Sequence, residues 1–234
     1  MSAALASVLE LRDVSCRRGP AAVCGIDLAF APGSFSLLTG AADSGHELLL
    51  RLLGLLEIPD TGVVLLEGAP VPANPEEARV KLRDRRLGFV FAAPFLLPAF
   101  SVIENVAMPL FKLSDVDPTQ ARSRSEALLD FVGLLEREQA LCGTLAPFEQ
   151  HRVSLARALV NEPAALLIEN LDAALADEEL RAFTALLRQC VTRFGVAVLA
   201  TATASFPSEP ADRVIELADG TLPRDPEFLP KAGA

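Results

Sequence analysis

The sequence predicts an α/β protein, because short apolar runs alternate along the chain with longer segments of helical periodicity. Two of these runs, Ala165–Ile168 and Val196–Ala200, are continuously apolar, which is typical of strands covered on both faces of a sheet. Turns or helical segments separate the runs that we interpret as strands. These are Ser7–Leu11, Phe35–Thr39, Val63–Glu67, Ala164–Glu169 and Gly195–Ala202.

Helices are expected where apolar residues recur three and four positions apart. The last such segment is the clearest, because leucine and phenylalanine residues follow the helical interval along it. The expected helices, in chain order, are Glu47–Leu56, Pro75–Asp84, Ile103–Lys112, Pro118–Val132, Phe148–Leu159 and Asp177–Phe194.

The 234 residues suit one domain with a large buried core, since 51% of them are apolar. The region from about 93 to 160 carries helical patterns and no strong strand pattern. We therefore expect residues 1–234 to form a single α/β domain into which a helical subdomain is inserted at about 93–160. Residues 222–234 contain three prolines and few periodic apolar positions, so we expect a loose tail there.

The formal net charge of −10 argues against nucleic acid and anionic lipid as bulk partners, because both need a positively charged surface. No apolar stretch reaches the roughly 18 residues of a membrane span, and the amino terminus lacks a signal-peptide pattern. We therefore expect a cytoplasmic protein. The four cysteines show neither metal-ligand nor disulfide spacing, and His46 and His151 lie on different motifs, so no metal site is predicted.

One loop has the spacing of a phosphate-binding P-loop, G-x-x-x-x-G-K-[ST], without its last two residues. The stretch GAADSGHE spans residues 40–47, between an apolar run and a leucine-rich segment. Gly40 and Gly45 stand where the two glycines belong. His46 replaces the lysine and Glu47 replaces the hydroxyl residue. The spacing alone leaves open whether the loop is a nucleotide site.

Five stretches carry a resemblance to a known family when they are taken together and in order. They are LELRDVSCRRG, GAADSGHELLLRLLGLLEIPDTGVVLLEGAPV, LGFVFAAPFLLPAFSVIENVAMPL, LAPFEQHRVSLARALVNEPAALLIENLDAAL and ADRVIELADGTL. Together they resemble the ATP-binding subunit of an ABC transporter, particularly its lipoprotein-releasing and macrolide-exporter branch. The resemblance covers nearly the whole chain, and RVSLARALVNEP is its most specific piece. It implies a P-loop NTPase fold of the ABC-cassette type, with a mixed sheet core and an inserted helical subdomain.

If nucleotide binding is retained, the resemblance implies ATP and Mg²⁺ as cofactors, and it gives each family motif a position here. The P-loop corresponds to Gly40, Ala41, Ala42, Asp43, Ser44, Gly45, His46 and Glu47. The Q-loop glutamine corresponds to Ala92. The four signature positions correspond to Ala146, Pro147, Phe148 and Glu149. The Walker B aspartate, the catalytic glutamate and the H-loop histidine correspond to Glu169, Asn170 and Ala202, or to Thr203 for the last if one gap is moved.

Most of these residues depart from the family pattern in ways that oppose ATP chemistry. In P-loop ATPases the lysine neutralises phosphate oxygens and the hydroxyl binds Mg²⁺. With a mostly neutral His46 and an anionic Glu47, the local charge is more negative by about two units, so we expect weak ATP binding. Asn170 cannot act as a carboxylate base. We expect Glu47 to cap its own helix, with direct binding of Mg²⁺ as the alternative.

Two further positions concern recognition of adenine and of the membrane subunit. The resemblance places Arg18 where the family has an aromatic residue that stacks on adenine. It also places a groove for the membrane subunit at about 92–110, a stretch rich in apolar residues. The residues expected to contact a permease are Phe95, Leu96, Leu97 and Phe100.

These observations favour a degenerate ABC transporter ATP-binding subunit, or pseudo-ATPase, with weak or absent ATP binding and hydrolysis. The resemblance implies that it docks on a membrane permease at the cytoplasmic face of the membrane. It also implies pairing with another ATP-binding subunit or with a second copy of itself. Two alternatives stay open: a divergent but active ABC ATPase that drives transport, and a scaffold or regulatory protein that needs no permease.

Overall fold

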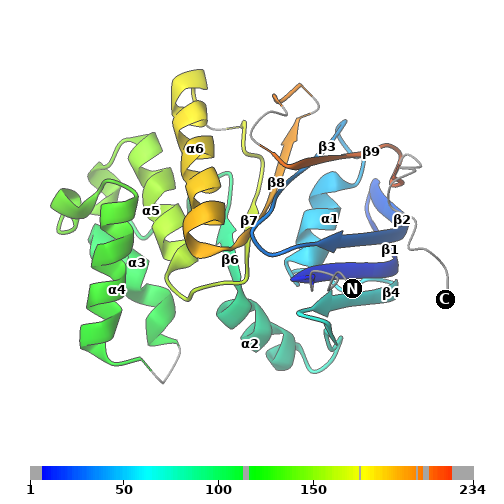
Figure 1. Ribbon diagram of the computed structural model, residues 1–234, viewed down its shortest axis with the longest axis horizontal. Coiled ribbons are helices and arrows are strands. Elements are labelled where there is room, and N and C mark those ends of the chain that lie inside the picture. The colour runs from blue at the N-terminus through cyan, green and yellow to red at the C-terminus, as the bar shows by residue number, and fades with distance from the viewer. Residues whose placement is uncertain (1–6, 113–115, 174, 204, 208–210, 223–234) are drawn as a thin grey trace, which may run out of the picture.

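The computed structural model describes residues 7–112, 116–173, 175–203, 205–207 and 211–222 (Figure 1). Within these ranges the chain forms two β-sheets and six α-helices. None of the helices in this part of the chain is long and apolar enough to cross a membrane. The expected tail at 222–234 lies outside the described residues, apart from its first position.

The smaller sheet is antiparallel and has the strand order β2-β1-β4-β5. Its hairpin joins β1 (Leu9–Arg18) to β2 (Ala21–Phe30) through Gly19, whose φ of +59° suits glycine because it has no Cβ. β4 (Thr61–Leu66) pairs with β1, and the short β5 (Ala69–Pro70) ends the sheet. Buried and exposed residues alternate in β1, so one face of this sheet packs on the core.

The larger sheet is parallel and has the strand order β6-β7-β8-β3-β9. Its side chains are buried on both faces, because Leu37 packs in one hydrophobic cluster and the adjacent Leu38 packs in the other. This explains the continuous apolar runs of the sequence. The strands in this order are Leu87–Val90, Ala165–Ile168, Ala197–Thr203, Phe35–Gly40 and Arg213–Leu217.

Helix α1 (His46–Leu53) lies between the two sheets (Figure 1). Its leucines, including the fully buried Leu49 and Leu52, fill the hydrophobic cluster between the sheets. The helix begins directly after the loop 40–45, at the carboxyl end of β3. This packing fixes the amino terminus of α1 at the edge of the parallel sheet.

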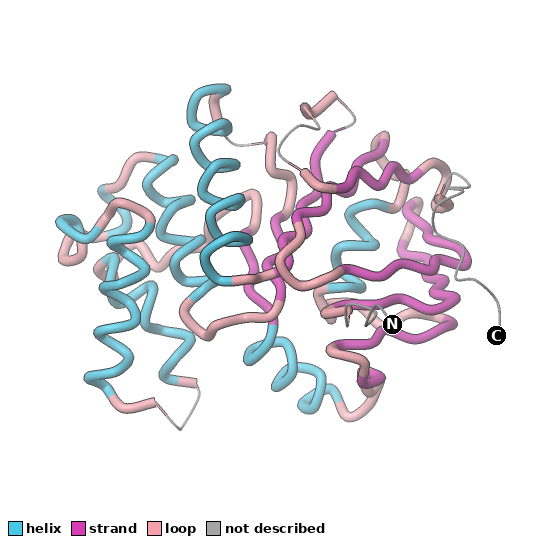
Figure 2. Tube along the Cα trace, in the orientation of Figure 1, coloured by secondary structure: helices cyan, strands magenta, loops and turns pink. Residues whose placement is uncertain are grey.

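The other helices gather mainly at one end of the molecule, away from the antiparallel sheet (Figure 2). Helices α3, α4 and α5 pack against one another there, and α6 packs on β8. Ser101 caps α3 in a capping box with Glu104, and Asp117 caps α4. The remaining helices, in order, are α2 (Glu76–Arg86), α3 (Val102–Phe111), α4 (Pro118–Phe131), α5 (Pro147–Leu159) and α6 (Asp177–Phe194).

The α/β prediction is confirmed, and the missed elements share a physical cause. The sequence analysis did not predict β2, β5, β6 or β9, and each of these is an edge strand of its sheet. An edge strand is covered less completely, so its apolar pattern is weaker or shorter. Helix α1 ends at Leu53 rather than Leu56, because Leu55 has a φ of +56° and leaves the helical conformation. The division into a core and an inserted helical subdomain stays a prediction.

Asp212 ties α6 to the parallel sheet. Its Oδ2 accepts a hydrogen bond from the backbone N–H of Phe35 at 2.8 Å, and the guanidinium of Arg188 donates to both of its carboxylate oxygens. The hydrogen bond from Arg188 is the largest cause that holds the pKa of Asp212 below its ordinary value. This carboxylate therefore stabilises the fold above the unfolded-state pKa, near 4, and loses that contribution as the pH falls through the folded-state pKa.

We expect Asp212→Asn to lower the free energy of unfolding by about 1 kcal/mol at pH 7. The expected effect is this small because both side chains of the ion pair are half-exposed and solvent screens their interaction. The variant should also lose less stability than the wild type when the pH falls below about 4. Urea denaturation at a series of pH values measures both effects. Asp130→Asn, at an exposed position on α4, is the matched control. Identical pH dependence of the wild type and Asp212→Asn would contradict the prediction.

Candidate functional site

The loop 40–45 connects the end of β3 to α1, and its two glycines fill positions without room for a side chain. A Cβ at Gly40 would lie 2.1 Å from the Oγ of Ser44. Gly45 has a φ of +97°, and a Cβ there would lie 2.2 Å from the carbonyl oxygen of Ala22. The loop therefore requires the glycine spacing of a P-loop. A loop of this form presents a helix amino terminus, which favours anions.

His46 occupies the lysine position of the P-loop spacing as a buried, hydrogen-bonded side chain. It is 6% exposed, and its Nδ1 lies 2.8 Å from the Oγ of Ser44. Burial lowers the pKa of His46 and outweighs the opposing influence of the carboxylates of Glu47 and Asp172. The ring is therefore neutral near pH 7 and brings no fixed positive charge to the loop.

Glu47 does not cap α1, contrary to the expectation from the sequence. The residue at the helix start is Gly45, and no side chain caps the first turn. Glu47 is exposed and accepts no hydrogen bond from the residues that the structure describes. The physical reason is its place as the second residue of the helix, whose side chain is directed to solvent. Its carboxylate still lies in the first turn, where the helix dipole favours a negative charge.

The carboxyl ends of β3 and β8 bring a second polar group beside the loop. Gly40 and Thr203 are partners across these two parallel strands. The carboxylate of Asp172 accepts hydrogen bonds from the backbone N–H of Thr203 at 3.1 Å and from its hydroxyl at 2.5 Å. The Oγ of Ser205 lies 3.0 Å from the Oγ1 of Thr203. This cluster ties the segment after β7 to the end of β8.

The residues expected at the Walker B, catalytic and H-loop positions lie at the same edge of the sheet. Glu169 and Asn170 directly follow β7 and are partly buried. The backbone N–H of Asn170 donates to the Oγ1 of Thr201 at 2.8 Å, and Asn170 has a φ of +47°. Ala202 is 1% exposed and offers only a methyl group. Of the two H-loop candidates, only Thr203 carries a polar side chain.

Ala92, which is expected at the Q-loop position, is linked to α5 through its backbone. Its carbonyl oxygen lies 3.2 Å from the Nε2 of His151, and the Nδ1 of the same ring lies 2.9 Å from the carbonyl oxygen of Pro147. A neutral imidazole donates one hydrogen bond, whereas a protonated one donates both. His151 thus joins the segment after β6 to the first turn of α5.

The residues expected at the signature positions form the start of α5, where Glu149 acts as a helix cap. Its Oε2 accepts a hydrogen bond from the backbone N–H of Ala146 at 2.9 Å, and its Oε1 lies 3.4 Å from the Nη1 of Arg137. Pro147 is the first helical residue, a position that tolerates a missing N–H. Phe148 packs partly on the core, with the guanidinium of Arg152 5.0 Å from its ring centre. These side chains make the first turn of α5 bulky, and they contact other residues of the same chain.

The stretch expected to contact a permease is exposed at three of its four named residues. Phe95 is 70% exposed, Leu97 39% and Phe100 44%. Leu96 is partly buried and packs on the core instead. Phe95 has a φ of +45°, and the guanidinium of Arg157 donates to its carbonyl oxygen at 2.9 Å and to that of Pro94 at 2.6 Å.

Arg18 does not present a free guanidinium for stacking. It donates to the carboxylates of Glu57 and Asp60, each at 3.0 Å, and to the carbonyl oxygen of Ile58 at 2.8 Å. A cavity of about 480 Å³ lies beside the loop 40–45, and its charged lining includes Asp43, Glu216, Asp219 and Arg17. Carboxylates outnumber cations in this lining, which disfavours a polyphosphate.

The residues present fit the shape of a phosphate site but not the charge of Mg-ATP as P-loop ATPases hold it. The loop glycines and the helix amino terminus are in place, whereas the lysine position holds a neutral imidazole and the neighbouring side chains of Glu47 and Asp172 are anionic. Among the described residues, no group of three or more His, Cys, Asp or Glu side chains is arranged to hold a metal ion.

A glycine-containing loop between a parallel β-strand and a buried helix, with polar groups at the carboxyl edge of the sheet, defines a P-loop nucleotide-binding fold. The chain belongs to the ABC transporter family, whose model matches residues 23–172. This family includes the ATP-binding subunits that the five sequence stretches resemble.

Curated relatives extend the match over most of the chain. The chain is 36% identical over 221 residues to the lipoprotein-releasing system ATP-binding protein LolD of Pseudomonas fluorescens, which covers 92% of this chain and 97% of that protein. It is 39% identical over 202 residues to LolD 2 of Caulobacter vibrioides, covering 85% of this chain and 86% of that protein. The predicted likeness to the lipoprotein-releasing branch is thus confirmed.

Solved structures confirm the ABC-cassette fold. The structure of cbiO1 from Clostridium perfringens, described as part of the ABC transporter complex cbiONQ, superposes with a TM-score of 0.85 at 20% identity and covers 93% of this chain and 87% of that chain. The dimeric ATP-binding cassette MJ0796 bound to ADP and Pi superposes with a TM-score of 0.78 at 24% identity, covering 92% and 97% of the two chains. At these identities the likeness concerns the fold alone.

Sequence reasoning missed two residues that organise the site. Asp172 accepts a hydrogen bond from the backbone N–H of Thr203 at the end of β8, and Arg157 donates one to the carbonyl oxygen of Phe95. An aspartate shortly after a buried strand was an available signal for the first, because such positions lie at the carboxyl edge of a parallel sheet. The partner of Arg157 lies 62 residues away in the chain, so its role had no local signal.

Proposed function

We propose that this chain is an ABC transporter subunit that docks on a membrane permease at its cytoplasmic face and pairs with another ATP-binding subunit, while its own nucleotide site binds and hydrolyses ATP weakly or not at all. The observation that carries the proposal is the neutral, buried His46 hydrogen-bonded to Ser44 in a loop that otherwise has P-loop shape. Without a cation at this position, the phosphate charge is left without its main partner.

The residues at the other nucleotide positions support weak hydrolysis. Asn170 has no carboxylate to act as a general base. Of the two H-loop candidates, Ala202 offers a methyl group, and the hydroxyl of Thr203 is bonded to the carboxylate of Asp172. At the signature positions, Pro147 lacks an N–H and Phe148 adds bulk where family members present a close backbone approach. A partner cassette that relied on this signature segment would therefore also be weakened. For that reason, a fast cycle in a complex of two such cassettes is not expected.

Retained docking is supported by the exposed apolar stretch after β6. Phe95 and Phe100 expose large apolar surface, which soluble surfaces usually avoid unless a partner covers it. A cavity of about 320 Å³ adjoins this stretch and is lined by Phe89, Phe91 and Met108, among others. The three carbonyl groups of residues 92, 94 and 95 are fixed by His151 and Arg157, so the surface is preorganised.

A divergent but active ATPase is the second candidate, and the relatives favour it. The curated relatives carry the name of ATP-binding proteins of a lipoprotein-releasing system. In addition, Glu169 keeps a carboxylate at the Walker B position, where it could bind Mg²⁺. In this second case the chain would itself drive transport, of lipoproteins or other hydrophobic cargo by analogy with these relatives.

Purification of the native complex through a tag on this chain tests both candidates. We expect a permease and a second ATP-binding subunit to be recovered with it, and we expect Glu169→Gln to change ATP turnover of the complex by less than about twofold, as for a residue outside the working site. Recovery without any permease would contradict the docking proposal and favour a scaffold protein. Loss of turnover with Glu169→Gln, and micromolar binding of Mg-ATP to the isolated chain, would favour the active ATPase.

A further inference from the structure

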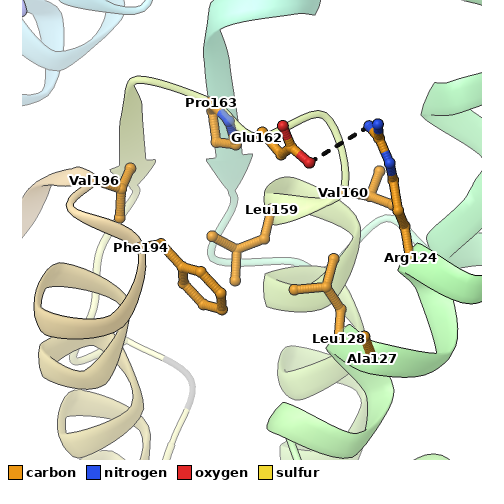
Figure 3. A pocket seen from close by; sticks show the side chains of 9 residues that line it. All are labelled: Arg124, Ala127, Leu128, Leu159, Val160, Glu162, Pro163, Phe194 and Val196. Carbon is orange, nitrogen blue, oxygen red and sulfur yellow. Dashed lines mark ion pairs between the residues drawn. The ribbon is translucent and has the colours of Figure 1, made fainter.

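An apolar cavity of about 410 Å³ lies among α4, α5 and α6 (Figure 3). It is bounded by α4, by the carboxyl ends of α5 and α6, and by the segments that enter β7 and β8. These segments lie at the amino-terminal edge of the parallel sheet, whereas the loop 40–45 lies at the carboxyl edge. The cavity is therefore separate from the nucleotide site, and its volume lies in the ~300–1,000 Å³ range of small-molecule sites.

The walls of this cavity are preformed and apolar. Leu159 and Val196 are buried in the floor, and Leu128 is partly buried beside them. Figure 3 shows the side chains of Leu128, Leu159 and Phe194 turned toward one another around the same space. Phe194 is 43% exposed, although it makes an edge contact with the ring of Phe131 at 5.1 Å between ring centres. Covering such a partly open apolar surface with a ligand is favourable, because apolar area is removed from water.

The charged side chains that line the cavity are Arg124 on α4 and Glu162 on the segment before β7, and the two form a long ion pair. The Nη1 of Arg124 lies 3.6 Å from the Oε1 of Glu162, beyond hydrogen-bond distance, and the Glu162 side chain is 76% exposed. By contrast, Arg122 on the same helix lies 2.7 Å from Glu126 and 3.0 Å from Glu138. Arg124 is thus a loosely paired cation directly above an apolar cavity.

We propose that this cavity binds an amphipathic monoanion, namely an aliphatic carboxylate of medium chain length. Its alkyl chain packs on Leu128, Leu159 and Val196, and its carboxylate replaces Glu162 as the partner of Arg124. A planar guanidinium binds a carboxylate through two parallel hydrogen bonds, which the present 3.6 Å contact with Glu162 does not provide. The ligand would contact α4 and α6 at once and so join the helical end of the molecule to the parallel sheet.

Isothermal titration of the full chain with decanoate, below its micelle concentration, tests the proposal. We expect saturable binding at one site, and a loss of affinity of about tenfold or more in Arg124→Glu, because a charge-assisted hydrogen-bonded pair is replaced by repulsion. Ala127→Trp places a large ring at the exposed mouth of the cavity and should abolish binding. Arg122→Glu, on the same helix but outside the lining, is the matched control and should retain the wild-type affinity.

A second titration with decanol separates the two parts of the proposal. The uncharged ligand should bind more weakly than decanoate to the wild type, and Arg124→Glu should leave its affinity unchanged. The absence of saturable binding of decanoate to the wild type would overturn the proposal. Equal binding of decanoate to wild type, Arg124→Glu and Ala127→Trp would do the same, and circular dichroism of each variant verifies that it is folded.

Discussion

The double variant His46→Lys/Glu47→Ser should bind Mg-ATP about a hundredfold more tightly than the wild type. Each hydrogen bond to a charged group contributes about 1.5–3 kcal/mol, and about 1.4 kcal/mol corresponds to a tenfold change in affinity. The lysine supplies the missing cation, and the serine removes a carboxylate from the first turn of α1. Both substitutions leave in place the two glycines that the loop requires. Equilibrium binding of a fluorescent ATP analogue measures the effect.

The two single variants divide this gain between its sources. Glu47→Ser alone should give the smaller increase, because the buried neutral ring of His46 still occupies the lysine position. Glu77→Ser is the matched control, since Glu77 is likewise the exposed second residue of a helix, in this case α2. If wild type and double variant bind Mg-ATP with the same micromolar affinity, His46 already serves the phosphate and the active ATPase is the better reading.

Phe95→Asp should lower recovery of the permease with this chain by about thirtyfold, if Phe95 anchors the docking surface. Truncating a hot-spot residue costs about 2 kcal/mol or more, which corresponds to about thirtyfold in affinity. The ring is 70% exposed, so the change leaves the hydrophobic core intact. Co-purification from membranes, quantified against the tagged chain, measures the loss.

Leu135→Asp is the matched control for this experiment. Leu135 is also an apolar residue with an exposed side chain, at 38%, and it lies outside the stretch after β6. Its variant should recover the permease as the wild type does. If both variants or neither lose the permease, the apolar stretch does not provide the specific contact. Unfolding measurements on each variant keep a loss of docking apart from a loss of fold.

Much of the fold could be predicted because its centre is repetitive and buried. The strand Ala165–Ile168 is continuously apolar and lies within the expected run 164–169, and the helix Asp177–Phe194 has both of the bounds that its periodicity predicts. The edge strand Arg213–Leu217 has fewer apolar residues, and its Val214 is exposed. It was therefore not predicted as a strand. Local pattern therefore identifies elements that are covered on both sides better than those at an edge.

Some features of the candidate site could also be predicted from neighbouring residues, whereas others depend on residues that are distant in the chain. The glycine spacing of Gly40 and Gly45 is local, and it correctly indicated a strand–loop–helix. The orientation of the Glu47 side chain could not be predicted from neighbouring residues, because it depends on which residue begins α1. The prediction that Glu47 caps this helix was wrong. The bond between Asp172 and Thr203 joins residues that only the sheet brings together. Sequence spacing gives the shape of the loop, but partners from other strands decide its chemistry.

The link between Ala92 and His151 has a consequence for how this chain tolerates sequence change. The contact uses the carbonyl oxygen of Ala92, a group that every amino acid supplies. Substitutions at position 92 can therefore accumulate without breaking the connection between the segment after β6 and α5. Position 151 has no such freedom, because only a side chain with suitable donors spans the gap to both carbonyl groups. The mutational constraint on this connection therefore lies on the helix rather than on the loop.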